Sequence, residues 1–156
     1  MKIMGTILKG LLYINDKDVY EEYGAFLTEE REGEFSNYEE LLKPPAMKAY
    51  TAVAFREEDG EELPDVLPSP RFEARDVTLY FALVASTPTE WLQKYALFVA
   101  FLKAGWLNIN VRELGKTYKM YYKQCNQYTQ VTPLENGKEV AAKLKVLLRE
   151  PKPVVG

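Results

Sequence analysis

The sequence lacks histidine and has a single cysteine, Cys125. A structural zinc site needs several cysteine or histidine ligands and an internal disulfide needs two cysteines, so the counts exclude both within this chain. Nucleophilic triads of the Ser-His-Asp or Cys-His kind are excluded because they need histidine. The glycines are scattered and form no phosphate-binding GxxxxGK or GxGxxG loop. We therefore expect no metal and no cofactor.

A long apolar run is also missing. A membrane span needs about 20 apolar residues, whereas the most apolar stretch here, residues 96–102, is enclosed by Lys94 and Lys103. Residues 1–15 contain no sustained apolar core and no small-residue cleavage site, so we expect no signal peptide. We expect a protein that stays in the cytoplasm where it is made and has no membrane partner.

Pairs of adjacent acids are present, but they do not form a recognisable catalytic pattern. Glu29-Glu30, Glu57-Glu58 and Glu61-Glu62 could in principle supply the two facing carboxyl groups of a glycosidase. Adjacent acids in a loop are more often a solvated charge run. An enzyme with paired carboxylates is the weakest of three functional hypotheses, and activity lost on changing one glutamate would reveal it.

The sequence TPTEWLQKYALFVAFLKAG, residues 87–105, predicts the one long helix. Thr87 is suited to cap the helix, with Glu90 three residues later as in a capping box, and Pro88 fits the first helical position. Gly105 is a stop signal. The residues expected to form the buried stripe are Trp91, Leu92, Tyr95, Val99 and Leu102.

The second half of this helix has no polar face for two turns, which indicates burial on more than one side. One interpretation places the helix inside the core of a single subunit. The other places Leu97 and Phe101, which lie about 180° from Val99 by the helical period, at an interface with a neighbouring subunit. Both interpretations remain open from the sequence.

Alternation of apolar and polar residues predicts strands in most of the remaining chain. Residues 10–27 predict a hairpin around Asn15-Asp16, and 75–85 predict a central strand with Phe81 and Leu83 in the core. Further strands are expected at 47–56, within a hairpin spanning 106–131, and at 140–149. A short helix is expected at 38–42, with Ser36 as its cap.

Two segments are expected to carry no regular structure. Residues 57–70 are rich in acids and contain three prolines, which predicts an exposed acidic loop. Residues 151–156 are expected to be a flexible tail. The whole chain, 1–156, is most simply one domain. It should be mainly β with one long α-helix, either a β-sandwich or a partly closed barrel with the helix packed on it.

The charges are divided between the two halves of the chain. Residues 16–65 contain 16 acids and 5 bases, a net charge of −11, whereas residues 103–152 contain 10 bases and 4 acids, a net charge of +6. These halves form either two separately solvated faces or unlike faces that meet between copies. The second interpretation favours head-to-tail association over nucleic-acid binding.

Several tyrosines in the second hairpin lie among lysines, and aromatic rings among bases can stack on sugars or nucleic-acid bases. The acidic chain weakens attraction for phosphates, and tyrosine is also common in strands. We therefore expect no specific nucleic-acid binding and keep these residues as a candidate ligand or partner surface. They are Tyr118, Tyr121, Tyr122 and Tyr128.

The chain resembles the N-terminal domain of the distal tail protein of long-tailed bacteriophages, and more loosely the tail-tube family. The resemblance extends over roughly residues 10–150. It lies in INDKDVYEEYGAFL, in KPPAMKAYTAVAFREEDG, in DVTLYFALVA followed by the predicted helix, in WLNINVRELGKTYKMYYKQC and in KLKVLLREP.

This resemblance implies a non-enzymatic structural protein of a phage or prophage tail. Such a protein forms a ring with itself, typically a hexamer, at the junction of the tail tube with the baseplate, and contacts other tail proteins. Its place would be the virion tail. The alternative is a small-ligand or sugar-binding β-sandwich that uses the tyrosines of the second hairpin. A screen of glycans by thermal shift separates the two.

Overall fold

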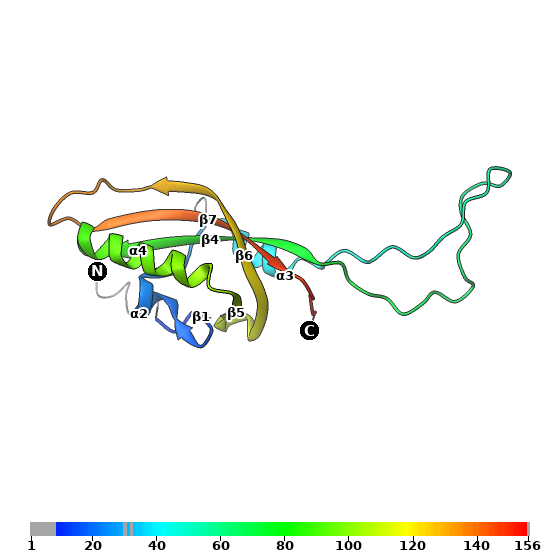
Figure 1. Ribbon diagram of the computed structural model, residues 1–156, viewed down its shortest axis with the longest axis horizontal. Helices are drawn as coiled ribbons and strands as arrows, with labels where there is room; N and C mark the ends of the chain where they lie inside the picture. The colour runs from blue at the N-terminus through cyan, green and yellow to red at the C-terminus, as the bar shows by residue number, and fades with distance from the viewer. Residues whose placement is uncertain (1–8, 30, 32, 156) are drawn as a thin grey trace.

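The computed structural model describes residues 9–29, 31 and 33–155. Its core is one seven-stranded sheet in the order β2-β1-β5-β6-β7-β4-β3 (Figure 1). All neighbouring strands are antiparallel. The strands are β1 (Leu12–Ile14), β2 (Lys17–Asp18), β3 (Ala25–Leu27), β4 (Arg75–Ala85), β5 (Trp106–Val111), β6 (Lys116–Gln130) and β7 (Val140–Glu150). The helices are α2 (Val19–Tyr23), α3 (Ser36–Leu42), α4 (Pro88–Leu102) and the 3₁₀ turn η1 (Arg112–Leu114).

The expected class, mainly β with one long helix packed on the sheet, is confirmed. The structure has one sheet where a sandwich would have two. Its two edges approach each other, because Leu12 of β1 and Phe26 of β3 line the same cavity of about 270 Å³. The sheet is therefore curled and incompletely closed.

Strand β4 has the role that its pattern predicted. It pairs with β7 along its whole length, from Arg75 opposite Glu150 to Ala85 opposite Val140. Val77, Leu79, Phe81 and Leu83 are fully buried. Phe81 meets Phe98 of α4 edge-on at 5.5 Å between ring centroids, so the core lies between these two elements.

Helix α4 begins as expected, since Thr87 Oγ1 accepts a hydrogen bond from the backbone N–H of Glu90 at 3.2 Å. Its buried stripe differs from the prediction. Trp91, Phe98 and Leu102 face the core, while Leu92 is exposed. Trp91 fixes this orientation, because its indole N–H donates to the carbonyl of Leu83 at 3.0 Å.

The opening hairpin is only half correct. Asn15 and Asp16 form the predicted turn, with φ of 53° and 64°. The chain then forms α2, because the Asp18 carboxylate accepts a hydrogen bond from the N–H of Tyr20 at 3.1 Å. Gly24 ends α2 with a φ of 67°, and a Cβ there would collide with the carbonyl oxygen of Val84. The next strand, β3, therefore lies at the opposite edge of the sheet from β1.

Helix α3 is present, but Ser36 does not cap it. The N–H of Ser36 instead donates to the Glu29 carboxylate at 2.6 Å. Asn37 accepts from the N–H of Tyr80 at 2.8 Å and donates to the carbonyl of Thr28 at 2.6 Å. The helix thus covers the part of the β4 edge that the short strand β3 leaves unpaired.

The predicted strand at 47–56 is wrong. This segment is extended, but it forms only isolated bridges, Met47 to Phe72 and Val53 to Glu62. It forms the outgoing leg of a long arm that projects from the molecule between α3 and β4 (Figure 1). The hairpin at 106–131 and the strand at 140–149 are confirmed, the latter as β7.

Candidate assembly surfaces

The arm, residues 43–74, connects α3 to β4 and extends away from the rest of the molecule (Figure 1). Its two legs run antiparallel. Near the root, the N–H of Lys48 donates to the carbonyl of Arg71 at 2.8 Å. Farther out, Val53 and Glu62 exchange two backbone hydrogen bonds of 3.0 and 2.7 Å. The arm is thus held by a few backbone bonds between its own legs.

The arm exposes large apolar side chains together with acids. Every residue from 53 to 73 is exposed, and Val66 retains 83 % of its accessible surface. The exposed large apolar residues are Met47, Val53, Phe55, Leu63, Val66, Leu67 and Phe72. The outer part, residues 57–65, which we call the tip, carries Glu57, Glu58, Asp59, Glu61, Glu62 and Asp65 and no base.

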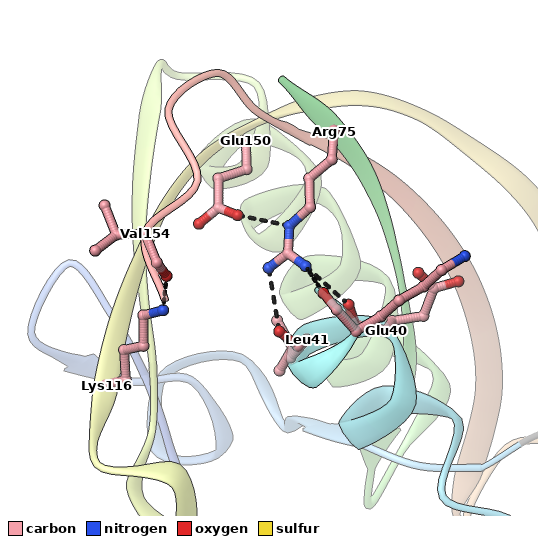
Figure 2. Close-up of polar contacts among 7 residues, drawn as sticks. Glu40, Leu41, Arg75, Lys116, Glu150 and Val154 are labelled. Atoms are coloured by element: carbon pink, nitrogen blue, oxygen red, sulfur yellow. Dashed lines mark hydrogen bonds and ion pairs between the residues drawn. The ribbon is translucent and has the colours of Figure 1, made fainter. Parts of the chain in front are cut away.

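The root of the arm is fixed by Arg75, as Figure 2 shows. Its Nε donates to Glu150 at 2.7 Å, and this ion pair is nearly buried, with side-chain exposures of 13 % for Arg75 and 4 % for Glu150. The other guanidinium nitrogens donate to the carbonyls of Leu41 at 3.1 Å and Lys43 at 2.7 Å. Arg75 therefore ties the point where the chain leaves α3 to the point where it enters the sheet.

The C-terminal segment lies near this root. Lys116 Nζ donates to the carbonyl of Val154 (Figure 2). Val154 and Val155 line a cavity of about 320 Å³ with Leu41, Leu42 and Tyr118. The flexibility predicted for residues 151–156 remains a prediction.

On the face of the sheet opposite the core, most of the charged side chains are basic. On β7, buried residues alternate with Lys143, Lys145 and Arg149 on the other face. Strand β6 adds Lys119 and Lys123 to this set. We call these five residues the basic face. They surround one acid, Asp76 of β4, which lies 3.0 Å from Arg149 and 3.3 Å from Lys123.

Asp76 is held ionised by its neighbours. The hydrogen bond from Arg149 lowers the pKa of this carboxyl below its ordinary value, with a smaller contribution from Lys123 that partial burial opposes. Asp76 can neutralise only part of the five positive charges. At neutral pH the basic face therefore keeps a net positive charge, although Glu29, Glu39 and Glu40 lie along its β3 and α3 border.

Aromatic rings lie among these cations. Trp106 of β5, which is 51 % exposed, meets Tyr121 of β6 at 5.9 Å between ring centroids. Lys119 Nζ lies 4.5 Å from the Trp106 ring centroid and Lys145 Nζ lies 5.5 Å from that of Tyr80. A hollow of about 220 Å³ near Lys143 and Lys145 is lined by Tyr80, Gln127 and Thr129. This face thus offers cations, exposed rings and a shallow recess.

The two residues proposed for a subunit interface differ in exposure. Leu97 is 59 % exposed, whereas Phe101 is half-buried and stacks on Tyr23 at 5.2 Å. The expectation that both face water in an isolated subunit is wrong for Phe101, since α2 shields it. Leu97 and Leu92 remain as exposed leucines on α4.

The four candidate tyrosines do not form one surface. Tyr118 is 2 % exposed and lies in the core, and Tyr122 packs against that core. Tyr121 lies on the basic face. Tyr128 is partly exposed beside Trp91 and Tyr95 near α4. The alternation of β6 and its two bulges, at Tyr122/Gln124 and Cys125/Gln127, separate the four rings.

Sequence reasoning assigned a net positive charge to residues 103–152, but it did not single out the five residues of the basic face or the apolar residues of the arm. The alternation of Lys143 and Lys145 with Ala142 and Leu144 was a signal for the former. For the arm, the signal was the proline content on both sides of 47–56.

Neither a metal site nor a membrane-spanning helix is found within the described residues. Among them, no group of three or more Cys, Asp or Glu side chains is placed to hold a metal ion. Of the helices in the same part of the chain, none is long and apolar enough to cross a membrane.

Comparison with known proteins gives a match of structure only. No family model and no curated protein sequence matches the chain. The fold is similar to the crystal structure of SPP1 Dit (gp 19.1), described as a hub adsorption apparatus in phages that infect Gram-positive bacteria, with a TM-score of 0.51 and 13 % sequence identity. The protein shares the fold of SPP1 Dit. The match covers 92 % of this chain and 52 % of SPP1 Dit, so the chain spans about half the length of that protein.

The part of SPP1 Dit that matches is its N-terminal half. The resemblance to the N-terminal domain of a distal tail protein, inferred above from the order of sequence segments, is therefore confirmed at the level of the fold. The residues of the arm and of the basic face are described here for this chain alone.

Proposed function

We propose that this protein is a non-enzymatic structural component of a phage or prophage tail. It forms a ring of identical subunits, in which a hexamer is the expected number, at the junction of the tail tube and the baseplate. The fold shared with SPP1 Dit supports a tail role. The observation that carries the assembly proposal is the arm, which extends exposed apolar side chains away from its own subunit.

An apolar surface of this kind indicates an interaction site. Large exposed apolar patches on soluble proteins mark interfaces, because burying them on a partner is favourable. A projecting arm and the surface that receives it are different parts of the molecule, which is the arrangement that a head-to-tail contact uses; a mutual exchange of arms between two copies would instead stop at a dimer. Head-to-tail contacts between identical subunits generate a closed ring when the rotation closes.

Helix α4 supplies a second candidate contact. Leu97 is the exposed member of the pair proposed from the sequence, and the exposed Leu92 lies on another flank of the same helix, about 140° around its axis. Phe101 contributes its outer edge only, because its ring stacks on Tyr23. Leu97 would add apolar area to the interface that the arm forms.

The test is to shorten the arm and measure assembly. Replacing residues 47–72 by a short glycine-serine turn should leave the thermal midpoint nearly unchanged, because none of this segment is fully buried. The same variant should remain monomeric in light scattering at concentrations where the full chain forms a ring visible by electron microscopy. A full chain that stays monomeric at every concentration and beside its neighbouring tail proteins would contradict the proposal.

A second variant tests the helix. Leu97→Glu should weaken assembly without unfolding the subunit, because Leu97 is exposed in the free chain. Gln93→Glu, an exposed position on the same helix, is the matched control for added charge. The double change Leu97→Glu with Phe101→Glu should also destabilise the subunit. Equal assembly of Leu97→Glu and the control would remove α4 from the interface.

A further inference from the structure

One chain carries both a strongly acidic projection and an uncovered basic surface. The tip of the arm has six acids within residues 57–65 and no base. The basic face has five cations around the acid Asp76, with Glu29, Glu39 and Glu40 along its border. The two surfaces are thus electrostatically complementary, and complementary charge steers encounter and fixes the register of a contact.

The two surfaces also match in their apolar content. Leu63, Val66 and Leu67 are exposed next to the acids of the tip. The basic face offers the Trp106–Tyr121 pair and the hollow beside Lys143 and Lys145. Apolar side chains of the tip would therefore meet rings or enter a recess while the acids meet lysines.

The arm is directed away from the basic face of its own subunit. Arg75 fixes the root through Glu150 and the carbonyls of Leu41 and Lys43. From that root the arm extends outward beyond the end of β4 (Figure 1). Because the arm is extended in this way, its tip lies away from its own sheet, and the occupant that we infer for the basic face is the tip of another copy (Figure 1).

The exposed surface of α4 is a poorer docking surface for the tip than the basic face. Its exposed large residues, Leu92 and Leu97, are uncharged, and Lys94 is paired with Glu90 at 3.0 Å. Six acids placed there would lose water without gaining a set of cations. The surface of α4 suits a contact with apolar side chains, whereas the acidic tip requires a surface with cations.

We propose that the acidic tip of the arm of one copy docks on the basic face of the next copy. This inference rests on the proposed ring assembly and names the surface that receives the arm. The charged groups of this contact remain accessible to water, so dissolved salt screens their attraction and weakens the contact. Assembly should require a higher protein concentration as salt is raised from low to about 0.5 M, because the Debye length falls well below 10 Å.

The decisive experiment reverses the charges on each side separately and then together. The tip variant carries Glu57→Lys, Glu58→Lys and Glu61→Lys, and the face variant carries Lys143→Glu and Lys145→Glu. Each should raise the concentration needed for half-assembly by at least about tenfold, since like charges then oppose each other. The variant with all five changes should assemble better than either parent.

A matched control reverses charges elsewhere. Glu135→Lys with Glu139→Lys changes two exposed acids in the 131–139 loop, outside both surfaces. This control should assemble like the parent. Circular dichroism and thermal midpoints of all variants establish that the subunits are folded.

A cross-linking measurement locates the contact directly. In a Cys125→Ser background, Glu58→Cys in one batch and Gln127→Cys in another place single thiols on the tip and on the basic face. Mixing the batches under oxidation should give a disulfide-linked dimer on a non-reducing gel. Gln93→Cys on α4 replaces Gln127→Cys in the control mixture and should give much less.

The outcomes separate this inference from the proposed function. A protein that never assembles contradicts the ring itself. In one outcome the ring needs the arm but tolerates both charge reversals, and in another the combined variant assembles no better than its parents. Either result supports the ring and overturns the proposed docking surface. A third outcome is that the parent binds double-stranded DNA and the face variant does not, while both assemble equally well. That result would assign the basic face to a polyanion and overturn the inference.

Discussion

Strand β4 follows the arm directly in the chain, and residues 47–56 of the arm were expected to form a strand from the same kind of alternation as β4. Residues 75–85 found a full-length partner in β7 and are buried on the core face. Residues 47–56 found only isolated bridges and remain exposed. The comparison shows that alternation describes what a segment can bury. Whether it is buried depends on a partner that the local sequence does not specify.

The largest expected difference concerns a phenylalanine in each region. Phe81→Ala should lower the free energy of unfolding by about 3 to 5 kcal/mol, because it removes a fully buried ring that contacts Phe98. Phe55→Ala in the arm should stay within about 0.5 kcal/mol of the parent. Denaturant midpoints of the monomer measure both. A loss below about 1 kcal/mol for Phe81→Ala would place β4 outside the core.

The next effect lies at the boundary between the two regions. Arg75→Met should cost about 3 kcal/mol, since it leaves the Glu150 carboxylate buried without its partner. Adding Glu150→Met should recover part of that loss, because no uncompensated charge then remains. Urea unfolding of the single and double variants is the measurement. A double variant whose loss of unfolding free energy equals the sum of the losses of the two single variants would contradict a coupled pair.

Two glycines provide a smaller and sharper contrast. Gly24→Ala should destabilise the subunit by roughly 1 to 3 kcal/mol, because its φ is positive and its Cβ would collide with the backbone of β4. Gly60→Ala imposes similar strain in the arm, where no atom lies within 4 Å of the added carbon. Its cost should stay within the arm and leave the midpoint of global unfolding unchanged. Equal shifts would show that the arm unfolds together with the sheet.

Proteolysis tests the same contrast without substitutions. The free protein should be cut first within residues 57–70 by an enzyme that cleaves after glutamate, because this segment is exposed and offers several acids. Mass spectrometry at early times identifies the site. First cleavage at acids of the sheet or helices would mean that the tip is protected in the free chain.

The smallest effect is expected at Asp76. Asp76→Asn should cost less than about 1 kcal/mol at pH 7, since this pair is largely exposed. The pKa of Asp76 is lowered in the folded state, so its contribution is present above the ordinary value of about 3.9 and is lost as the pH falls through the lowered value. The stabilities of parent and variant should converge in that acidic range. A difference that widens there would contradict the assignment.

The elements predicted correctly are those whose signals are local. The cap at Thr87, the turn at Asn15-Asp16 and the alternation of β4 each act within a few residues. Asp18 and Gly24 were similar signals for α2, but the apolar residues flanking the Asn15-Asp16 turn favoured a hairpin instead.

The elements that were missed depend on distant partners. Glu29 replaces Ser36 at the start of α3 from seven residues away, and Arg75 meets Glu150 across the sheet. Of the candidate site residues, Leu97 is exposed as expected from its position about 180° from Val99 by the helical period, although Val99 itself is only half-buried. Tyr128 could not be placed, because the two bulges of β6 precede it and change the facing of the strand, whereas Tyr118 precedes both bulges and is buried by the simple alternation of β6.

The root of the arm also determines how the molecule would bear mechanical load. A force that pulls the arm outward enters the sheet through Arg75 and acts along β4 (Figure 1). The register of β4 against β7 runs without interruption from Arg75–Glu150 to Ala85–Val140, so such a pull stretches many ladder bonds at once rather than one at a time. The sheet is therefore loaded in shear, the direction in which antiparallel strands resist separation best. If the arm docks on a neighbouring copy as proposed, it should slip from that copy before its own subunit unfolds.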